Sequence, residues 1–211
     1  MHPFTTLTGI AAPLPLSNVD TDVIIRINRL TAGDVGLLGR YAFEALRYLA
    51  EGKENPDFVL NMPRYKGAQV LIAGPNFGCG SSREPAVWAL MAMGLRCVIA
   101  QSFGDIFYGN CFQNGLLPLR FDETTIKELA NEAIATPGPF TVDLVQRCVI
   151  VPSGKKYAFV IDDQRRAALL EGLDDIGLTL QHVAEINVWQ ANDQISRPWV
   201  WEKHLEQFRR V

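Results

Sequence analysis

The residues best suited to chemistry lie in the segment Asn-Phe-Gly-Cys-Gly-Ser-Ser-Arg-Glu, residues 76–84. Gly78 and Gly80 can adopt backbone angles that other residues resist, and they let a ligand approach the main chain closely. Ser81 or Ser82 can cap a following helix, whose first N–H groups and dipole then favour an anion. The segment therefore predicts an anion-binding loop, although a capped strand–loop–helix connection has the same residues.

Arg83 adds to this loop a planar guanidinium that can hold a carboxylate through two parallel hydrogen bonds. Pro85 falls in the expected first helical turn, where a missing N–H costs little. Cys79 could act as a thiolate near a helix start, but no histidine is evident as its base. The chain also lacks G-x-G-x-x-G, G-x-x-x-x-G-K-[ST] and G-x-S-x-G, which disfavours nucleotide-binding loops and a hydrolase nucleophile.

A second polar group follows the first expected strand, residues 6–12. Asp20 and Asp22 flank Thr21 in this loop. Asx-type capping of a turn explains these aspartates slightly better than direct chemistry does.

Apolar runs and helical periodicity predict the elements that position these loops. Strands are expected at residues 6–12, 70–73, 97–100, 116–119, 140–145, 147–151 and 157–161. Helices are expected at residues 40–50, 83–93, 122–135, 163–172 and 179–189, and Phe103, Ile106, Phe107 and Cys111 share one further helical face. Asp122 is the expected cap of the helix at 122–135. The alternation of strand and helix from 70 to 135 predicts a partly parallel sheet with helices packed on it. Trp199, Trp201 and Phe208 in the last residues predict a tail that packs on this domain or on a partner.

Composition places the chain among ordinary globular proteins: 211 residues, 48% hydrophobic, with a net charge of −3. The charge does not fit a nucleic-acid binder, and no apolar run approaches the roughly 20 residues that span a bilayer. The start lacks the pattern of a secretory signal, so we expect a cytoplasmic protein. Four widely spaced cysteines and three scattered histidines predict no metal or cofactor site on this chain.

Several motifs in order resemble one family. They are residues 18–25 (Asn-Val-Asp-Thr-Asp-Val-Ile-Ile), 76–84, 102–110 (Ser-Phe-Gly-Asp-Ile-Phe-Tyr-Gly-Asn), 114–119 (Asn-Gly-Leu-Leu-Pro-Leu) and 177–182 (Gly-Leu-Thr-Leu-Gln-His). Together they closely resemble isopropylmalate dehydratase small subunits, with coverage from about residue 6 to 182. Each motif alone is weak, whereas the ordered set is specific.

The resemblance implies an α/β fold: a single aconitase-like swivelling domain over residues 1–211, with three β/β/α layers and a partly parallel sheet. Its core would span about 6–162, with a helical C-terminal extension at about 163–211. It also implies a separate large subunit that carries a [4Fe–4S] cluster through three cysteines, in a heterodimer or heterotetramer. The complex would convert 2-isopropylmalate to 3-isopropylmalate by dehydration and rehydration, in leucine biosynthesis.

The resemblance also implies roles for individual residues. Ser81 would be the catalytic base, acting as an alkoxide that loop amides and Arg83 stabilise. The substrate, a small di- or tricarboxylate, would be bound by Gly80, Ser82, Arg83, Asp20 and Thr21.

Two positions depart from the family pattern, which commonly has proline at Arg26 and histidine at Pro85. The stretch from about residue 26 to 39 matches poorly, and in the family this loop recognises the group on the substrate's third carbon. The corresponding residues here are Arg26, Asn28 and Leu30. A substrate of the 2-methylmalate, dimethylmalate or homoaconitate type therefore stays open, as does a non-catalytic subunit that binds an anion.

Overall fold

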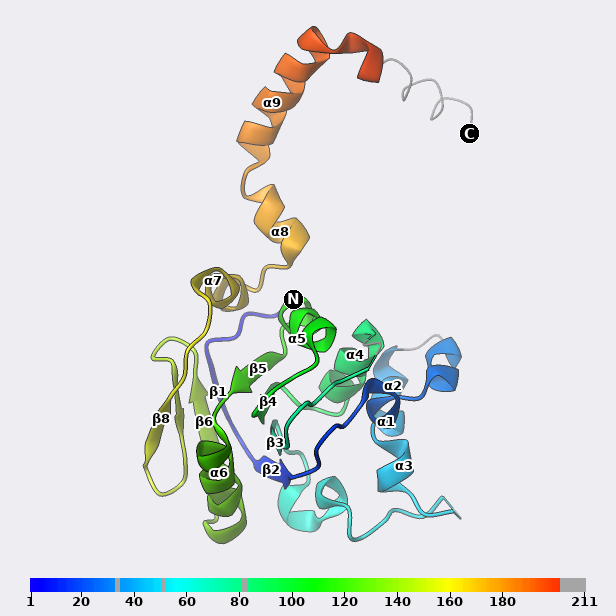
Figure 1. Ribbon diagram of the computed structural model, residues 1–211, viewed down its shortest axis with the longest axis vertical. Coiled ribbons are helices and arrows are strands. Elements are labelled where there is room, and N and C mark those ends of the chain that lie inside the picture. Colours follow the sequence, from blue (N-terminus) through cyan, green and yellow to red (C-terminus); the bar gives the residue numbers. More distant parts are fainter. Residues whose placement is uncertain (33–34, 51, 81–82, 202–211) are drawn as a thin grey trace. The chain divides into compact units, whose positions relative to one another are not determined.

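The computed structural model describes residues 1–32, 35–50, 52–80 and 83–201 (Figure 1). The chain divides into two compact units, the first of which is Met1–Asp174 and the second of which begins at Asp175. The helix over Asp163–Glu171 belongs to the first unit, whereas the sequence placed the start of the extension at about residue 163.

A parallel sheet forms the middle of the first unit, which confirms the predicted partly parallel sheet. Its strands, in spatial order, are β2 (Ala11–Leu14), β3 (Val70–Ala73), β4 (Cys97–Ala100) and β5 (Leu117–Arg120). Every residue of β2, β3 and β4 is buried. Continuous apolar runs are expected in such strands, because both faces of the sheet are covered.

A second sheet is antiparallel. Its strands, in spatial order, are β1 (Thr6–Gly9), β6 (Phe140–Asp143), β7 (Cys148–Ile150) and β8 (Lys156–Ala158). The prediction of one strand over residues 6–12 was wrong, because the chain changes sheets at Ile10. The Ile10 carbonyl accepts hydrogen bonds from the N–H groups of Gln69 and Val70, and this directs the next residues into the parallel sheet.

The two faces of the parallel sheet bury different clusters, which gives the predicted β/β/α layers. Val70 and Ile72 pack with Phe140 and Val142 of the antiparallel sheet. Leu71 points to the opposite face of the sheet, where it packs against helices. Alternate residues of one strand therefore build two separate cores.

The helices of the first unit follow mostly from local signals. They are α1 (Thr21–Ile24), α2 (Leu38–Tyr41), α3 (Glu44–Arg47), α4 (Glu84–Ala92), α5 (Asp105–Asn114), α6 (Glu123–Ala135) and α7 (Asp163–Glu171), with 3-10 turns η1 (Ile27–Ala32), η2 (Val35–Leu37), η3 (Val59–Asn61) and η4 (Pro63–Tyr65). The Asp122 carboxylate accepts from the Thr125 N–H at 2.9 Å, which confirms the predicted cap of α6.

Two predicted helical features were wrong. The expected helix over residues 40–50 is two short helices, because buried Phe43 has a φ of 55° and donates its N–H to the Ile24 carbonyl. On α5, Ile106 is 58% exposed rather than inward, whereas Phe107 and Cys111 are fully buried.

The second unit contains α8 (Asp175–Leu180) and α9 (Val183–Ser196), where one helix over 179–189 was expected. The Trp201 indole N–H donates to the Asp193 carboxylate at 2.9 Å, so this tryptophan packs within the unit. Trp199 is 62% exposed, and Phe208 lies outside the described residues. In the described part of the chain, no helix combines the length and apolar character needed to cross a bilayer.

The neighbours Ile106 and Phe107 provide a test of this packing. Phe107→Ala should lower the free energy of unfolding by about 3–5 kcal/mol, because it leaves a cavity in the core. Ile106→Ala, on the exposed face of the same helix, should change it by at most about 0.5 kcal/mol. Urea unfolding monitored by circular dichroism measures both values, and equal losses would contradict the assignment of the buried face.

Candidate functional site

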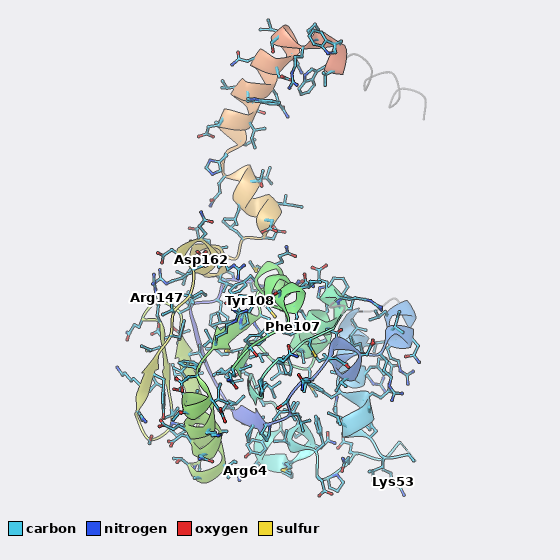
Figure 2. All side chains as sticks on the ribbon, in the orientation of Figure 1. Lys53, Arg64, Phe107, Tyr108, Arg147 and Asp162 are labelled. Atoms are coloured by element: carbon cyan, nitrogen blue, oxygen red, sulfur yellow. The ribbon has the colours of Figure 1, made fainter. Side chains whose placement is uncertain are left out.

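Three loops meet where the parallel strands end. Carboxyl ends of adjacent parallel strands share one edge of the sheet, where ligands of such sheets commonly bind. Here the loops are residues 15–20 after β2, 74–83 after β3 and 101–104 after β4, and we call them the edge loops. Figure 2 shows Phe107 and Tyr108 on the helix that follows the third loop.

Backbone hydrogen bonds join the edge loops directly. The Gly78 N–H donates to the Val19 carbonyl at 2.7 Å, and the Thr21 N–H donates to the Cys79 carbonyl at 3.2 Å. On the other side, the Phe77 N–H donates to the Ser102 carbonyl at 3.0 Å. The middle loop is therefore held between its two neighbours.

The two glycines of the middle loop have different roles. Gly78 has a φ of 70°, and a Cβ there would lie 2.3 Å from Cγ of Phe107. Gly80 has a φ of 88°, and among the described residues a Cβ there would meet only the Asp20 Cβ, at 3.8 Å. Close packing requires glycine at 78, whereas the described residues leave space beside the main chain at Gly80.

Two asparagines that the sequence analysis did not single out help to hold this geometry. Asn18 and Asn76 both have positive φ values, 55° and 59°. The Asn76 side-chain amide donates to the Asn18 side-chain oxygen at 2.8 Å, and the Asn76 N–H donates to the Ser102 hydroxyl at 2.8 Å. Asparagine tolerates this left-handed conformation better than most residues, which is the signal that could have identified them.

Asp20 caps α1, as the turn-capping interpretation predicted. Its carboxylate accepts from the Val23 N–H at 2.7 Å. Thr21, the first residue of the helix, is buried, and Asp22 is exposed. Asp20 also forms an isolated parallel bridge with Cys79, so it lies beside the middle loop.

Ser81 and Ser82 lie outside the described residues, so their assignments stay predictions. The expectation that one of them caps the helix was wrong, because α4 begins at Glu84 and the capping position is Arg83, with an extended backbone. The Arg83 side chain is exposed and forms no ion pair with a carboxylate of the described residues. Its guanidinium is therefore available to an external anion.

Glu84 is anchored by a network that the sequence analysis missed. The Asn114 side-chain amide donates to the Glu84 carboxylate at 2.9 Å, and the Trp88 indole N–H donates to the Asn114 side-chain oxygen at 2.8 Å. This network fixes the start of α4, next to Arg83, to the end of α5.

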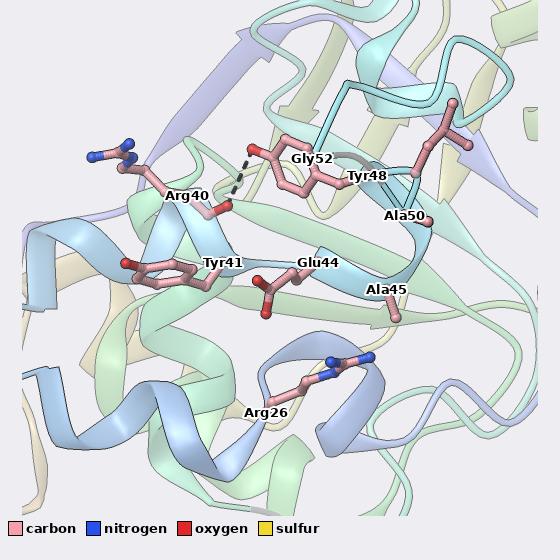
Figure 3. A pocket seen from close by; sticks show the side chains of 9 residues that line it. Arg26, Arg40, Tyr41, Glu44, Ala45, Tyr48, Ala50 and Gly52 are labelled. Atoms are coloured by element: carbon pink, nitrogen blue, oxygen red, sulfur yellow. Dashed lines mark hydrogen bonds between the residues drawn. The ribbon is translucent and has the colours of Figure 1, made fainter.

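A pocket of about 590 Å³ lies beside the predicted specificity residues (Figure 3). Its lining comprises Arg26, Arg40, Tyr41, Glu44, Ala45, Tyr48, Leu49, Ala50 and Gly52. Of the three residues predicted to set specificity, Arg26 lines this pocket, Asn28 is exposed on η1, and Leu30 packs on the core.

Charge in this pocket is partly neutralised. The Arg29 guanidinium donates to both Glu44 carboxylate oxygens and lowers the pKa of that carboxyl, with a smaller contribution from the positive charge of Arg26. Arg29 also lies over the Tyr41 ring, 4.6 Å from its centroid. Glu44 is thus bound to Arg29, and Arg26 keeps a charge that a ligand could use.

The cysteines differ in environment. Burial raises the pKa of the Cys97 and Cys111 thiols, which keeps them protonated, whereas Cys79 is half-buried in the middle loop. Among the residues that the structure describes, no three histidine, cysteine, aspartate or glutamate side chains are grouped as metal ligands.

Comparisons with known proteins match this fold and these loops. The family model of the aconitase C-terminal domain matches residues 1–124, so the class is that of aconitase-like domains. A second model describes the C-terminal domain of the small subunit in 3-isopropylmalate dehydratase. It matches residues 175–200, at the start of the second unit.

Full-length relatives narrow this class to a particular family. A 3-isopropylmalate dehydratase small subunit from Dinoroseobacter shibae is 49% identical over 95% of this chain and 100% of its own length. One from Gluconacetobacter diazotrophicus is 50% identical over 94% of this chain and 97% of its own length. A solved 3-isopropylmalate dehydratase structure from Methanocaldococcus jannaschii covers 89% of this chain and 99% of its own, at 25% identity and a TM-score of 0.62. The chain belongs to the family of 3-isopropylmalate dehydratase small subunits.

The two glycines of the middle loop give a matched pair of variants. Gly80→Ala should lower the free energy of unfolding by about 1–2 kcal/mol, because a Cβ is strained at positive φ. Gly78→Ala should cost about 1–3 kcal/mol more, because its Cβ also overlaps Phe107. Chemical denaturation of both variants measures the difference, and equal losses would refute the close packing at Gly78.

Proposed function

We propose that this chain is the small subunit of a 3-isopropylmalate dehydratase, a hydro-lyase of leucine biosynthesis. With a large subunit it would convert 2-isopropylmalate to 3-isopropylmalate. The observation that carries the proposal is the full-length similarity to curated small subunits at 49% identity. The edge loops support it, because they leave the Gly80 main chain and the Arg83 guanidinium open to an anionic ligand.

The reaction sets two demands that one polar loop can meet. A weakly acidic proton must leave a carbon beside a carboxylate, and the negative charge that develops must be stabilised. Pre-organised N–H groups and a guanidinium stabilise such charge strongly, because they need no reorganisation during the reaction. The middle edge loop offers the exposed Arg83 guanidinium, and we assign the N–H groups to the proposed binding residues Gly80 and Ser82.

We assign the base to Ser81 and the carboxylate contacts to Gly80, Ser82 and Arg83. Arg83 is exposed, and the Glu84–Asn114–Trp88 network fixes the helix start beside it. Asp20 and Thr21 would complete the binding set from the neighbouring loop, which two hydrogen bonds hold against residues 78 and 79. The Asp20 carboxylate already accepts the Val23 N–H, so its part would be to position this loop.

The large subunit would carry the [4Fe–4S] cluster, which supplies a Lewis acid for the leaving hydroxyl group. Cys97 and Cys111 of this chain are buried, and burial raises the pKa of both thiols. The two chains would form a heterodimer or heterotetramer. The four free cysteines also fit a reducing compartment such as the cytoplasm.

Replacement of Ser81 tests the catalytic assignment. In the two-chain complex, Ser81→Ala should lower kcat by about 10²–10⁴-fold, since the base would be lost. Steady-state assays under anaerobic conditions measure this loss, and circular dichroism checks that the chain remains folded.

Ser153→Ala is the matched control, because Ser153 lies in the turn between β7 and β8, on the antiparallel sheet. The control should keep wild-type activity. Full activity of Ser81→Ala in an assembled complex would contradict the assignment of Ser81 as the catalytic base. It would favour a non-catalytic subunit that binds an anion.

The pocket at Arg26 favours a second candidate within the same reaction class. A guanidinium that lines a pocket of about 590 Å³ suits a polar or carboxylate substituent better than an isopropyl group. The alternative is therefore a hydro-lyase that acts on another substituted malate, of the 2-methylmalate, dimethylmalate or homoaconitate type.

A substrate panel separates the two candidates. We expect the highest kcat/KM for 2-isopropylmalate, and we expect Arg26→Ala to change this value by less than about threefold, since a solvent-facing arginine would contribute little to binding an apolar isopropyl group. A preference for a substrate with an additional carboxylate, lost in Arg26→Ala, would establish the alternative.

A further inference from the structure

Two arginines stack on one tyrosine close to the edge loops. The guanidinium carbon of Arg120 lies 4.0 Å from the centroid of the Tyr108 ring, and that of Arg165 lies 5.1 Å from the same centroid. The two charges are therefore no more than 9.1 Å apart. Arg165 also lies 4.8 Å from the centroid of Phe112, whose ring meets Tyr108 edge-on. We call these four side chains the arginine cluster.

The cluster carries positive charge that the described residues do not neutralise. Among the cationic side chains, five pair with acids: Arg29 with Glu44, Lys127 with Glu123, Arg147 with Asp163, Lys155 with Glu128 and Arg197 with Asp193. Arg120 and Arg165 are exposed and form no such pair with a described carboxylate. In a chain of net charge −3, two neighbouring unpaired cations form a local site for external carboxylates.

The arginine cluster lies close to the edge loops of the candidate site. Arg120 is the last residue of β5, so it lies at the carboxyl edge where the edge loops meet. Tyr108 contacts Phe103 at a centroid distance of 5.6 Å, and Phe103 contacts Phe77 of the middle loop at 6.4 Å. A row of packed aromatic rings thus connects the cluster to the loop that carries Gly78 and Gly80.

We propose that the arginine cluster is a docking contact for acidic side chains of the large subunit. The inference rests on the proposed function, in which the large subunit must present its iron–sulfur cluster to this same edge of the sheet. Stacking restrains each guanidinium before binding, which reduces the conformational entropy lost on association. The N–H groups in the guanidinium plane remain free for bidentate bonds to carboxylates.

The test measures the affinity of separately purified large and small subunits by biolayer interferometry under anaerobic conditions. Arg120→Gln and Arg165→Gln should each weaken binding by roughly tenfold, and the double variant by more, as expected for charged contacts across an interface. The double variant should also show a weaker dependence of affinity on salt. Its kcat at saturating large subunit should equal that of the wild type, because neither arginine belongs to the catalytic loop.

Lys127→Gln is the matched control, since it removes one exposed positive charge on α6 and should leave the affinity unchanged. Arg120→Lys with Arg165→Lys keeps the charge but loses the contact of the guanidinium groups with the rings. This variant should retain most of the association rate while dissociating faster, and it replaces the glutamine variant if that one unfolds.

Wild-type affinity of a folded double glutamine variant would overturn the docking contact. If citrate at low millimolar concentration then raised the melting temperature of the wild type and not of that variant, the cluster would be a site for small anions. These results leave the proposed function intact, whereas a wild-type pair that neither assembles nor turns over 2-isopropylmalate would refute the proposed function itself.

Discussion

The hydrogen bonds between the edge loops set the geometry on which the rest of the structure depends. They join main chain to main chain, so the three loops must approach more closely than most side chains allow. A Cβ at Gly104 would lie 2.4 Å from the Gly78 carbonyl oxygen. Because β2, β3 and β4 are parallel neighbours, their ends deliver these loops to one edge in a fixed order. Residues 76–79 of the middle loop cannot shift without displacing both neighbours.

Local signals allowed much of this arrangement to be predicted from sequence. Val70–Ala73 and Cys97–Ala100 are apolar throughout, and such short runs are typical of strands buried on both faces. The Asp122 carboxylate accepts a hydrogen bond from Thr125, three residues away, and this cap was predicted correctly. The errors arose where a hydrogen bond to a distant residue determines the backbone conformation. The Ile10 carbonyl bonds to residues 69 and 70, and the Phe43 N–H bonds to Ile24.

In the candidate site too, some features were predictable from local sequence and others depend on distant residues. Asp20 as a cap and the glycines at 78 and 80 were predictable, because backbone conformation and capping are properties of neighbouring residues. The hydrogen bond from Asn114 to Glu84 spans 30 positions, and nothing in either local sequence indicates it. Ser81 and Ser82 lie outside the described residues, so their roles rest on the family resemblance.

Exposed arginines at this edge suit a subunit that is incomplete by itself. Asp20 uses its carboxylate to cap α1, whereas Arg83, Arg120 and Arg165 are exposed without an acidic partner among the described residues. Exposed cations without partners add little to folding stability, so selection for stability alone does not explain their place beside one set of loops. Two external anions would account for them: a substrate carboxylate at Arg83 and, at the arginine cluster, acids of the proposed large subunit. On this view the edge is a surface shaped for a complex, with the substrate enclosed between the two chains.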